Sequence, residues 1–390
     1  MTPGARVQAA IEVLDQVLAG SAAERELTAW ARGSRYAGSR DRAAVRDHVF
    51  DALRRLRSSA WAGGLGDVPM EQMTGRAVMA GLLSGQGEDL GQLFTGEGHA
   101  PAPLSEMPAP GRAPDTVALD CPDWLWPLAQ ASLGDGATAI FEALRDRAPV
   151  TLRANSARVT RAALIARLAG EGVEATPHPL SQTAVIVTGK TRGLTLLDSF
   201  VDGLFELQDA GSQALVDRVP AASGEAILDL CAGGGGKALA LAARVDADIS
   251  VHDIDAARMR DVPTRAERAG ARIKVLTTLD RKTRFDGVVA DVPCSGSGSW
   301  RRAPEAKWRL TPARLQELTA LQAQILDRAI DLTKPGGWTA YMTCSLLAGE
   351  NADIVDAVLS RRGDVSLVQR WQCSPLDGAD GFHLSVLRRN

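Results

Sequence analysis

The sequence of 390 residues has few cysteines, few aromatic side chains and very few lysines. Its five cysteines are odd in number, widely spaced and without a Cys-x-x-Cys pair, which argues against a disulfide framework and against a zinc cluster. The five histidines are scattered as well. We therefore expect neither structural disulfides nor a metal.

Long apolar runs are also absent. No stretch approaches about 18 consecutive apolar residues, so no transmembrane helix is expected. The first six residues lead into a polar, acid-containing helix pattern rather than a signal-peptide core. These absences predict a cytoplasmic protein that has no membrane partner. We also expect the protein to be monomeric.

The charge of the chain is nearly balanced, at a net −3, and only six of its 44 basic residues are lysines. Codon bias in a GC-rich genome explains this excess of arginine as well as function does. Residues 1–62 hold ten arginines against seven acids. Because phosphate contacts depend on local charge, both an RNA-binding face and an ordinary solvated surface stay open here.

The N-terminal part has helical periodicity. Apolar residues recur every three or four positions over 7–18 and 45–56, and a third apolar run covers 77–83. Five prolines in residues 101–114 indicate an extended linker. We predict an all-α domain over residues 1–115, with a domain boundary in the linker.

Two further domains are expected after the linker. Strand patterns at 150–155 and 184–187 flank a helical one at 161–168, which predicts a small α+β module over residues 120–222. From residue 223 to 390, strands and helices alternate, which predicts a doubly wound, mostly parallel α/β sheet of Rossmann-like class.

A glycine-rich turn joins the first strand of this sheet to a helix, in the run Ile227-Leu-Asp-Leu-Cys-Ala-Gly-Gly-Gly-Gly-Lys237. Glycines allow a ligand close to the backbone, and a helix N-terminus favours negative groups. A P-loop would need glycine at position 231 and Ser or Thr at 238, whereas the chain has Cys231 and Ala238. The P-loop reading therefore fails.

Two cofactors remain compatible with the turn. Gly233-x-Gly235-x-x-Ala238 formally matches a dinucleotide fingerprint, and Asp253 follows Gly233 by 20 residues, at the end of the second strand. A carboxylate there accepts ribose hydroxyls from NAD or from S-adenosylmethionine. A tight turn without a ligand is the third reading.

Two cysteines stand where hydrophobic strands end. Asp291-Val-Pro-Cys294-Ser-Gly-Ser-Gly298 follows one strand, and Tyr341-Met-Thr-Cys344-Ser345 ends another. Such positions expose reactive groups in an open parallel sheet, and Asp291 is placed to hydrogen-bond the polar edge of a base. A single buried cysteine is usually an inert small hydrophobe, but two in these surroundings indicate attack by a thiolate on an electron-poor ring.

The sequence as a whole resembles the RNA cytosine-5 methyltransferases of the Sun/RsmB/Nop family, of the bacterial rRNA type. The resemblance spans roughly residues 120–390, and Arg40–Leu56 more faintly resembles the NusB-like helical domain that precedes the catalytic part. The motifs that carry it are Leu230–Lys237, Asp291–Gly298, Arg301–Trp308, Thr343–Ser345 with Glu350-Asn351, Asp380–Phe382, Gln208–Ser212 and Leu152-Arg153-x-Asn155. The family usually has Ala-Pro where this chain has Gly233-Gly234.

The resemblance implies transfer of a methyl group from S-adenosylmethionine to cytosine C5 in RNA. It implies that Cys344 attacks C6, that Cys294 serves product release and that Asp291 binds the cytosine edge. The RNA phosphates would be bound by Arg301, Arg302 and Lys307, for which a solvated face is the competing reading. The implied cofactor residues are Cys231, Ala232, Gly233, Gly234, Gly235, Gly236, Lys237, Asp253, Asp280 and Asp291, although the motif around Asp280 aligns in more than one way.

Other functions fit the sequence less well. The RNA is expected to be 16S rRNA, with tRNA as the alternative. A non-catalytic RNA-binding or ribosome-assembly protein on the same fold has no need of two such thiols, and a nicotinamide dehydrogenase leaves the Asp-Val-Pro-Cys motif unexplained. DNA is disfavoured because the Thr-Cys-Ser motif resembles the RNA enzymes. Cys121 and Cys373 receive no role.

Overall fold

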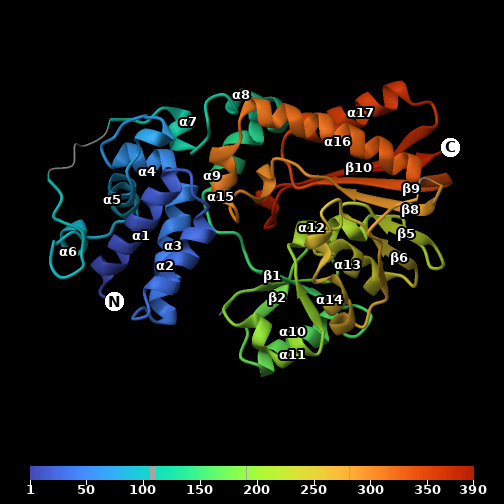
Figure 1. Cartoon of the computed structure of the whole chain (residues 1–390), viewed down its shortest axis with the longest axis horizontal. Helices are drawn as coiled ribbons and strands as arrows, with labels where there is room; N and C mark the ends of the chain where they lie inside the picture. Colours follow the sequence, from blue (N-terminus) through green and yellow to red (C-terminus); the bar gives the residue numbers. More distant parts are fainter. Residues whose placement is uncertain (106–110, 190, 281) are drawn as a thin grey trace. The chain divides into compact units, whose positions relative to one another are not determined.

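The computed structural model describes residues 1–105, 111–189, 191–280 and 282–390 (Figure 1). They form two compact units. The first comprises Met1–Arg147 with Trp300–Arg309, and the second comprises Ala148–Ser299 with Leu310–Asn390. The first unit therefore continues past the proline-rich segment where the sequence suggested a boundary, and it takes in a short segment from the C-terminal half of the chain.

The first unit is helical. Its core lies between α1 (Pro3–Leu18), α3 (Ser39–Arg54), α4 (Leu56–Ala62) and α5 (Gly75–Gly85), where the apolar residues of the 3.6-residue pattern are buried. Threonine hydroxyls cap α1 and α5. The other helices are α2 (Ala23–Gly33), α6 (Leu90–Leu93), α7 (Asp115–Ala118), α8 (Trp126–Leu133), α9 (Ala137–Leu144) and α15 (Pro304–Arg309), with 3-10 turns at Met70–Gln72 and Gly134–Gly136.

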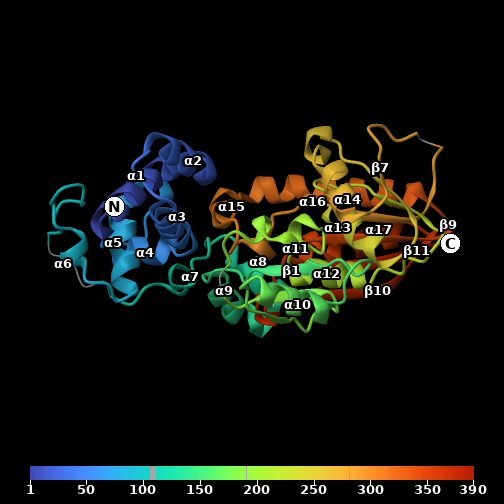
Figure 2. The ribbon, with the colours of Figure 1, turned by 90° about the horizontal axis from the view of Figure 1, so that it is seen from below.

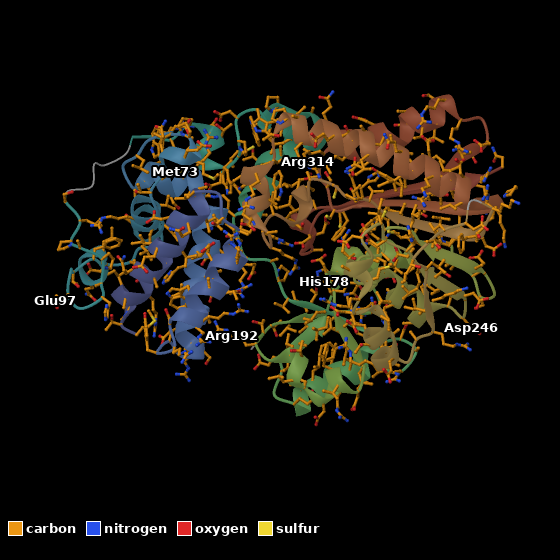
Figure 3. All side chains as sticks on the ribbon, viewed as in Figure 1. Met73, Glu97, His178, Arg192, Asp246 and Arg314 are labelled. Carbon is orange, nitrogen blue, oxygen red and sulfur yellow. The ribbon has the colours of Figure 1, made fainter. Side chains whose placement is uncertain are left out.

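The second unit begins with a small antiparallel sheet in the order β2-β3-β1-β4. Its elements are β1 (Thr151–Ala154), α10 (Arg161–Gly170), β2 (Ala175–Pro177), β3 (Ala184–Val187), a 3-10 turn at Leu194–Leu196, α11 (Asp198–Val201) and β4 (Phe205–Leu207). His178, labelled in Figure 3, is buried after β2 and its Nε2 lies 3.1 Å from the Gly378 carbonyl oxygen. This contact links the small sheet to the C-terminal part of the same unit.

The larger sheet has seven strands in the order β10-β11-β9-β8-β5-β6-β7. The strands from β7 to β9 pair in parallel, as the alternating sequence pattern predicts, whereas β11 is antiparallel to both of its neighbours. The strands are β5 (Ala226–Asp229), β6 (Asp248–Val251), β7 (Ile273–Val275), β8 (Phe285–Asp291), β9 (Thr333–Thr343), β10 (Val365–Cys373) and β11 (Phe382–Arg389). The predicted Rossmann-like α/β class is confirmed, and the antiparallel end is an addition to it.

Helices cover both faces of this sheet (Figures 1 and 2). Alternate strand residues point to opposite sides: Ile227 packs with α12 (Ala210–Asp217), α13 (Gly236–Arg244) and α14 (Val262–Ala269), whereas Leu228 packs with α16 (Pro312–Leu332) and α17 (Ala352–Arg361). The remaining 3-10 turns are Ala256–Met259, Ser297–Ser299, Ala348–Glu350 and Pro375–Asp377. In the described part of the chain, no helix is both long enough and apolar enough to cross a bilayer.

Candidate active site

The two predicted cysteines meet at the carboxyl edge of the large sheet. Strands β8 and β9 are parallel neighbours, with Asp291 opposite Met342, so the turns that follow them leave the sheet side by side. The Sγ atoms of Cys294 and Cys344 lie 3.4 Å apart. The structure therefore brings together two thiols that are 50 residues apart in the chain.

The surroundings of the two thiols differ. The pKa of Cys344 is lowered because Cys294 is placed to donate a hydrogen bond to its sulfur and because Lys237 carries a positive charge nearby, which together outweigh burial and Asp291. The pKa of Cys294 is raised well above its usual value by the bond with Cys344, by burial and by the negative charge of Glu350. The arrangement favours a thiolate on Cys344 and a thiol on Cys294.

Lys237 connects the glycine-rich turn to the cysteine turns. It is the second residue of α13, it is buried, and its Nζ donates to Asp291 Oδ2 at 2.5 Å. Although burial lowers the pKa of Lys237, the charge and hydrogen bond of Asp291 outweigh it and the net shift is upward. The sequence placed Lys237 among the cofactor residues, whereas its ammonium lies on the carboxylate expected to bind the base. The second oxygen of Asp291 has no protein partner in the described part of the chain.

Close backbone hydrogen bonds hold the turns after β8 and β9 together, and they leave no room for a side chain at Gly298. The Gly298 N–H donates to the Cys344 carbonyl at 2.9 Å, and the Gly298 carbonyl accepts from the Gly381 N–H at 2.9 Å. A Cβ on Gly298 would lie 2.1 Å from the Gly381 oxygen, which no side chain can do. Glycine at this place lets three segments approach within hydrogen-bonding distance behind Cys344.

The glycine-rich turn is built as a cradle at the start of α13. Gly233 and Gly235 adopt positive φ angles of 50° and 75°, and a Cβ on Gly235 would lie 3.0 Å from Val262. Asp253, buried after β6, accepts from the Gly233 N–H at 2.9 Å and lies 3.3 Å from the Arg258 guanidinium. The predicted carboxylate and the predicted turn are therefore joined directly.

An unpaired carboxylate lies beneath this turn. Asp229, the last residue of β5, is 1% exposed, and neither of its oxygens accepts a hydrogen bond of normal geometry in the described part of the chain. Burial, together with the negative charge of Asp291, raises the pKa of Asp229 to about 7. An orphaned carboxylate fits a cationic ligand group, such as the ammonium of S-adenosylmethionine, better than the anionic pyrophosphate of a dinucleotide. The turn thus fits S-adenosylmethionine.

The small sheet also contacts the glycine-rich turn, through Arg153. Arg153 of β1 is buried and its Nη1 donates to Gln208 Oε1 at 2.5 Å and to the Gly236 carbonyl at 2.7 Å. Gly236 is the first residue of α13. Two motifs that the sequence singled out without a function therefore fix the start of the helix that carries Lys237.

Several predicted site residues lie elsewhere. Arg301 and Lys307 are buried in the helical unit, where Trp308 donates to the Leu53 carbonyl at 2.7 Å and burial lowers the pKa of Lys307 to about 8. This burial argues against the predicted phosphate contacts of both side chains. Arg302 is exposed.

The other predicted residues differ in exposure. Asp280 is also exposed, and its Oδ1 accepts from the Lys282 N–H. Cys231 lies in the turn, and burial raises its pKa to about 12, so it is no candidate nucleophile. Cys121 and Cys373 are buried. Among the described residues, no three His, Cys, Asp or Glu side chains are grouped to hold a metal.

Sequence reasoning assigned no role to two acids of this region, Asp229 and Glu350. Two sequence features could have marked these acids as site residues. Asp229 is an acid inside an otherwise apolar strand, and Glu350 belongs to the motif after Cys344. Glu350 is fully buried and accepts hydrogen bonds from residues beside both cysteines. Both acids are visible as functional candidates only once the strand ends are brought together.

Comparison with known proteins identifies the family. Residues 219–385 match the family model described as 16S rRNA methyltransferase RsmB/F, and residues 121–192 match the RsmF/B ferredoxin-like domain. Together these matches cover well over half of the chain. The chain belongs to the RsmB/F methyltransferase family.

Curated relatives agree with this assignment. Proteins named ribosomal RNA small subunit methyltransferase B are 34% identical over 256 residues in Serratia proteamaculans and over 285 residues in Pectobacterium carotovorum. The alignments cover 64% and 69% of this chain but only 59% and 66% of those proteins, so this RsmB/F chain aligns with about three fifths of their length.

Among solved structures, the protein PH0851 matches with a TM-score of 0.79 at 20% identity, covering 100% of this chain and 99% of that one. NSun6 from Pyrococcus horikoshii, crystallised with SFG, matches with a TM-score of 0.62 at 17% identity over 69% of this chain and 98% of that one. At such identities these two structures support the fold.

Proposed function

We propose that this RsmB/F protein transfers a methyl group from S-adenosylmethionine to C5 of a cytosine in RNA, through a covalent bond between Cys344 and C6. The observation that carries the proposal is the pair of thiols 3.4 Å apart, one favoured as thiolate and the other as thiol. A module that only binds RNA has no use for this pair.

The thiolate solves a chemical problem of the substrate. Cytosine C5 is a poor nucleophile, and the Cys344 sulfur activates it by giving an electron pair to C6, which forms the S–C6 bond and leaves electron density on C5. Asp291 holds the N3/N4 edge of the base through its free oxygen, and a proton on N3 stabilises the displaced charge. The base must leave its stack to reach this pocket.

The bound cofactor supplies an electrophilic methyl group on a sulfonium sulfur. Once C5 carries the methyl group, transfer of the C5 proton to a base in the pocket or to water, with departure of the sulfur from C6, restores the aromatic ring and returns the Cys344 thiolate. We assign Cys294, whose sulfur lies beside that of Cys344, to this second half of the reaction.

The cofactor would be held by the turn from Cys231 to Gly236 and by Asp253, with Asp229 facing its cationic end. Lys237 acts differently from the other residues of the turn, because its ammonium pairs with Asp291 and orients that carboxylate. Asp280 stays a candidate on the loop after β7. These assignments rest on the positive-φ turn and on the unpaired carboxylate beneath it.

The helical unit offers a surface for RNA, as expected of a NusB-like domain. Tyr36 is 73% exposed between α2 and α3. A hollow of about 500 Å³ between these helices is lined by Arg32, Arg42, Arg46 and Trp30, among others. The arginines at positions 32, 35, 40 and 42 are exposed, and none pairs with a carboxylate in the described part of the chain. Exposed guanidinium groups suit phosphates, and the exposed ring of Tyr36 suits a stacked base.

The favoured substrate is small-subunit rRNA, because the curated relatives carry that name. The test is transfer of a labelled methyl group from S-adenosylmethionine to 16S rRNA and to tRNA by the purified protein, with Cys344→Ala as control. We expect label at cytosine C5 in 16S rRNA with the wild type and none with Cys344→Ala. Label in tRNA alone would show that the substrate is tRNA and not 16S rRNA. No label in either RNA would contradict the proposed activity.

A further inference from the structure

Glu350 is a buried carboxylate without a cation. It ends the 3-10 turn Ala348–Glu350, its exposure is 0%, and it makes no ion pair within the described part of the chain. An unpaired buried charge is costly unless hydrogen bonds compensate it. The partners that compensate the buried charge of Glu350 therefore indicate the role of this side chain.

Four donors surround the two carboxylate oxygens. Oε1 accepts from the Ser295 N–H at 2.7 Å and from Gln322 Nε2 at 3.0 Å. Oε2 accepts from the Ser295 hydroxyl and from the Ser345 hydroxyl, each at 2.5 Å. Gln322 in addition donates to the Pro293 carbonyl at 2.9 Å.

The donors are the immediate neighbours of the two thiols. Ser295 follows Cys294 and Ser345 follows Cys344, so one carboxylate is bonded to the next residue of each cysteine turn. We propose that Glu350 is the positioning residue of the two-thiol site, which holds the turns after β8 and β9 in the register that places the two sulfurs side by side. Its catalytic meaning rests on the proposed methyltransferase function.

Only a carboxylate satisfies this set of donors fully. The Ser295 N–H and the Gln322 Nε2 group, as they are oriented here, donate to the carboxylate, and an ionised carboxylate only accepts, with room for about four bonds. A glutamine at position 350 would retain one acceptor oxygen and turn an N–H₂ toward the two hydroxyls. An aspartate lacks one methylene and cannot reach both turns at once. The charge of Glu350 also lies close enough to Cys294 to favour its thiol form, in keeping with the raised pKa of that cysteine.

The experiment compares Glu350→Gln and Glu350→Asp with the wild type, and uses Asp353→Asn, an exposed acid three residues away, as the matched control. The first readout needs no RNA. Phenylarsine oxide captures two thiols only when they lie side by side, and variants Cys294→Ala and Cys344→Ala define the signal without a pair. The second readout is steady-state methyl transfer, with kcat and the KM for RNA determined separately.

We expect both Glu350 variants to capture the arsenical at least tenfold more slowly than the wild type. We also expect a fall in kcat of about 100-fold, the typical result of displacing a reactive group by about 1 Å, with a change in the KM for RNA of less than about threefold. Asp353→Asn should match the wild type. Ser345→Ala, which removes one of the four bonds, should show a smaller loss in both readouts and serves if the Glu350 variants do not fold.

If Glu350→Gln captures the arsenical and methylates RNA as fast as the wild type, Glu350 has no positioning role. The same result in Ser345→Ala decides the question if the Glu350 variants do not fold. Wild-type arsenical capture and wild-type kcat in Glu350→Asp would show that the longer side chain of glutamate is not needed to reach both turns. Failure of the proposed function looks different: Cys344→Ala would then retain methyl transfer, or the wild type would have none, while the capture experiment could still show the effect of Glu350 on the thiol pair.

Discussion

The Cys294 sulfur lies 3.4 Å from the Cys344 sulfur; the positive charge of Lys237 acts on Cys344, and the negative charge of Glu350 acts on Cys294. Parallel pairing of β8 with β9 creates the proximity. The hydrogen bond between the two sulfurs, together with the charges of Lys237 and Glu350, creates the difference between the thiols. The proposed cofactor turn, the proposed carboxylate for the base and the proposed nucleophile thus converge on one edge of the sheet. The following predictions test each part of this arrangement.

Replacing Lys237 by methionine should make Cys344 less reactive at neutral pH. The positive charge of Lys237 lowers the pKa of Cys344, so its removal raises that pKa and leaves less thiolate at any pH below it. The rate of iodoacetamide modification of Cys344, followed by mass spectrometry from pH 6 to 10, should rise only at higher pH in the variant. Lys334→Met is the matched control, because Lys334 pairs with Asp286 near the start of β8. An unchanged profile would refute the role of Lys237.

Replacing Asp229 by asparagine should change how stability depends on pH. The pKa of Asp229 rises from 3.8 to about 7 on folding, so between these values the folded state holds a proton that the unfolded state has lost. Its contribution to the free energy of unfolding is complete below pH 3.8 and falls by about 1.4 kcal/mol per pH unit as pH rises toward 7.

Urea unfolding of wild type and Asp229→Asn from pH 4.5 to 7 should therefore show the variant gaining relative stability with rising pH. The variant should also bind S-adenosylhomocysteine more weakly at pH 8, where the wild-type carboxylate is ionised and faces the ammonium of the ligand. A stability difference that is flat over this pH range would show that Asp229 is already ionised in the folded protein.

Replacing Gly298 by alanine should damage the site through the backbone. The added Cβ would collide with the Gly381 carbonyl at 2.1 Å, so the turn must shift and the Gly298–Cys344 hydrogen bond must stretch. We expect a loss of about 1–3 kcal/mol in the free energy of unfolding, and methyl transfer at least tenfold slower. Gly349→Ala, where a Cβ meets open space, should behave as wild type. Equal behaviour of the two variants would contradict the steric argument.

Replacing Tyr36 by alanine, or Arg35 and Arg40 together, should weaken RNA binding without changing kcat at saturating RNA. Each arginine that contacts a phosphate should lower the slope of log affinity against log salt by about 0.7–0.9, whereas Tyr36 should leave the slope unchanged. Binding is measured by fluorescence anisotropy between 50 and 300 mM salt, roughly the range in which phosphate contacts are screened. Arg314→Ala, labelled in Figure 3, removes an arginine paired with Glu317 and should have no effect. If the variant that lacks Arg35 and Arg40 binds RNA with wild-type affinity, this surface of the helical unit does not bind RNA.

Much of the fold and the site is readable from the sequence because local patterns carry it. The strand and helix alternation after residue 223 predicted the sheet, and the position of Cys294 and Cys344 at the ends of two of its strands indicated both as site residues. These features depend on periodicity and on where strands end.

Other features depend on packing that no local pattern encodes. Arg301 and Lys307 have the composition of a phosphate-binding loop, yet α15 packs into the helical unit and buries them. The Lys237–Asp291 pair joins residues 54 positions apart, and its geometry follows from the sheet order. The motif after Cys344 marks Glu350 in the sequence, but its contact with Ser295, 55 residues away in the chain, follows only from the packing of the two strand ends.

The most direct test of the central claim is a covalent complex. Cys294→Ala, incubated with S-adenosylmethionine and 16S rRNA, should accumulate a protein–RNA band that survives a denaturing gel, because Cys344 still attacks C6 but release is blocked. The double variant Cys294→Ala, Cys344→Ala should give no band. A band that persists without Cys344, or no band from Cys294→Ala in a preparation whose wild type methylates RNA, would contradict the assignment of the two thiols.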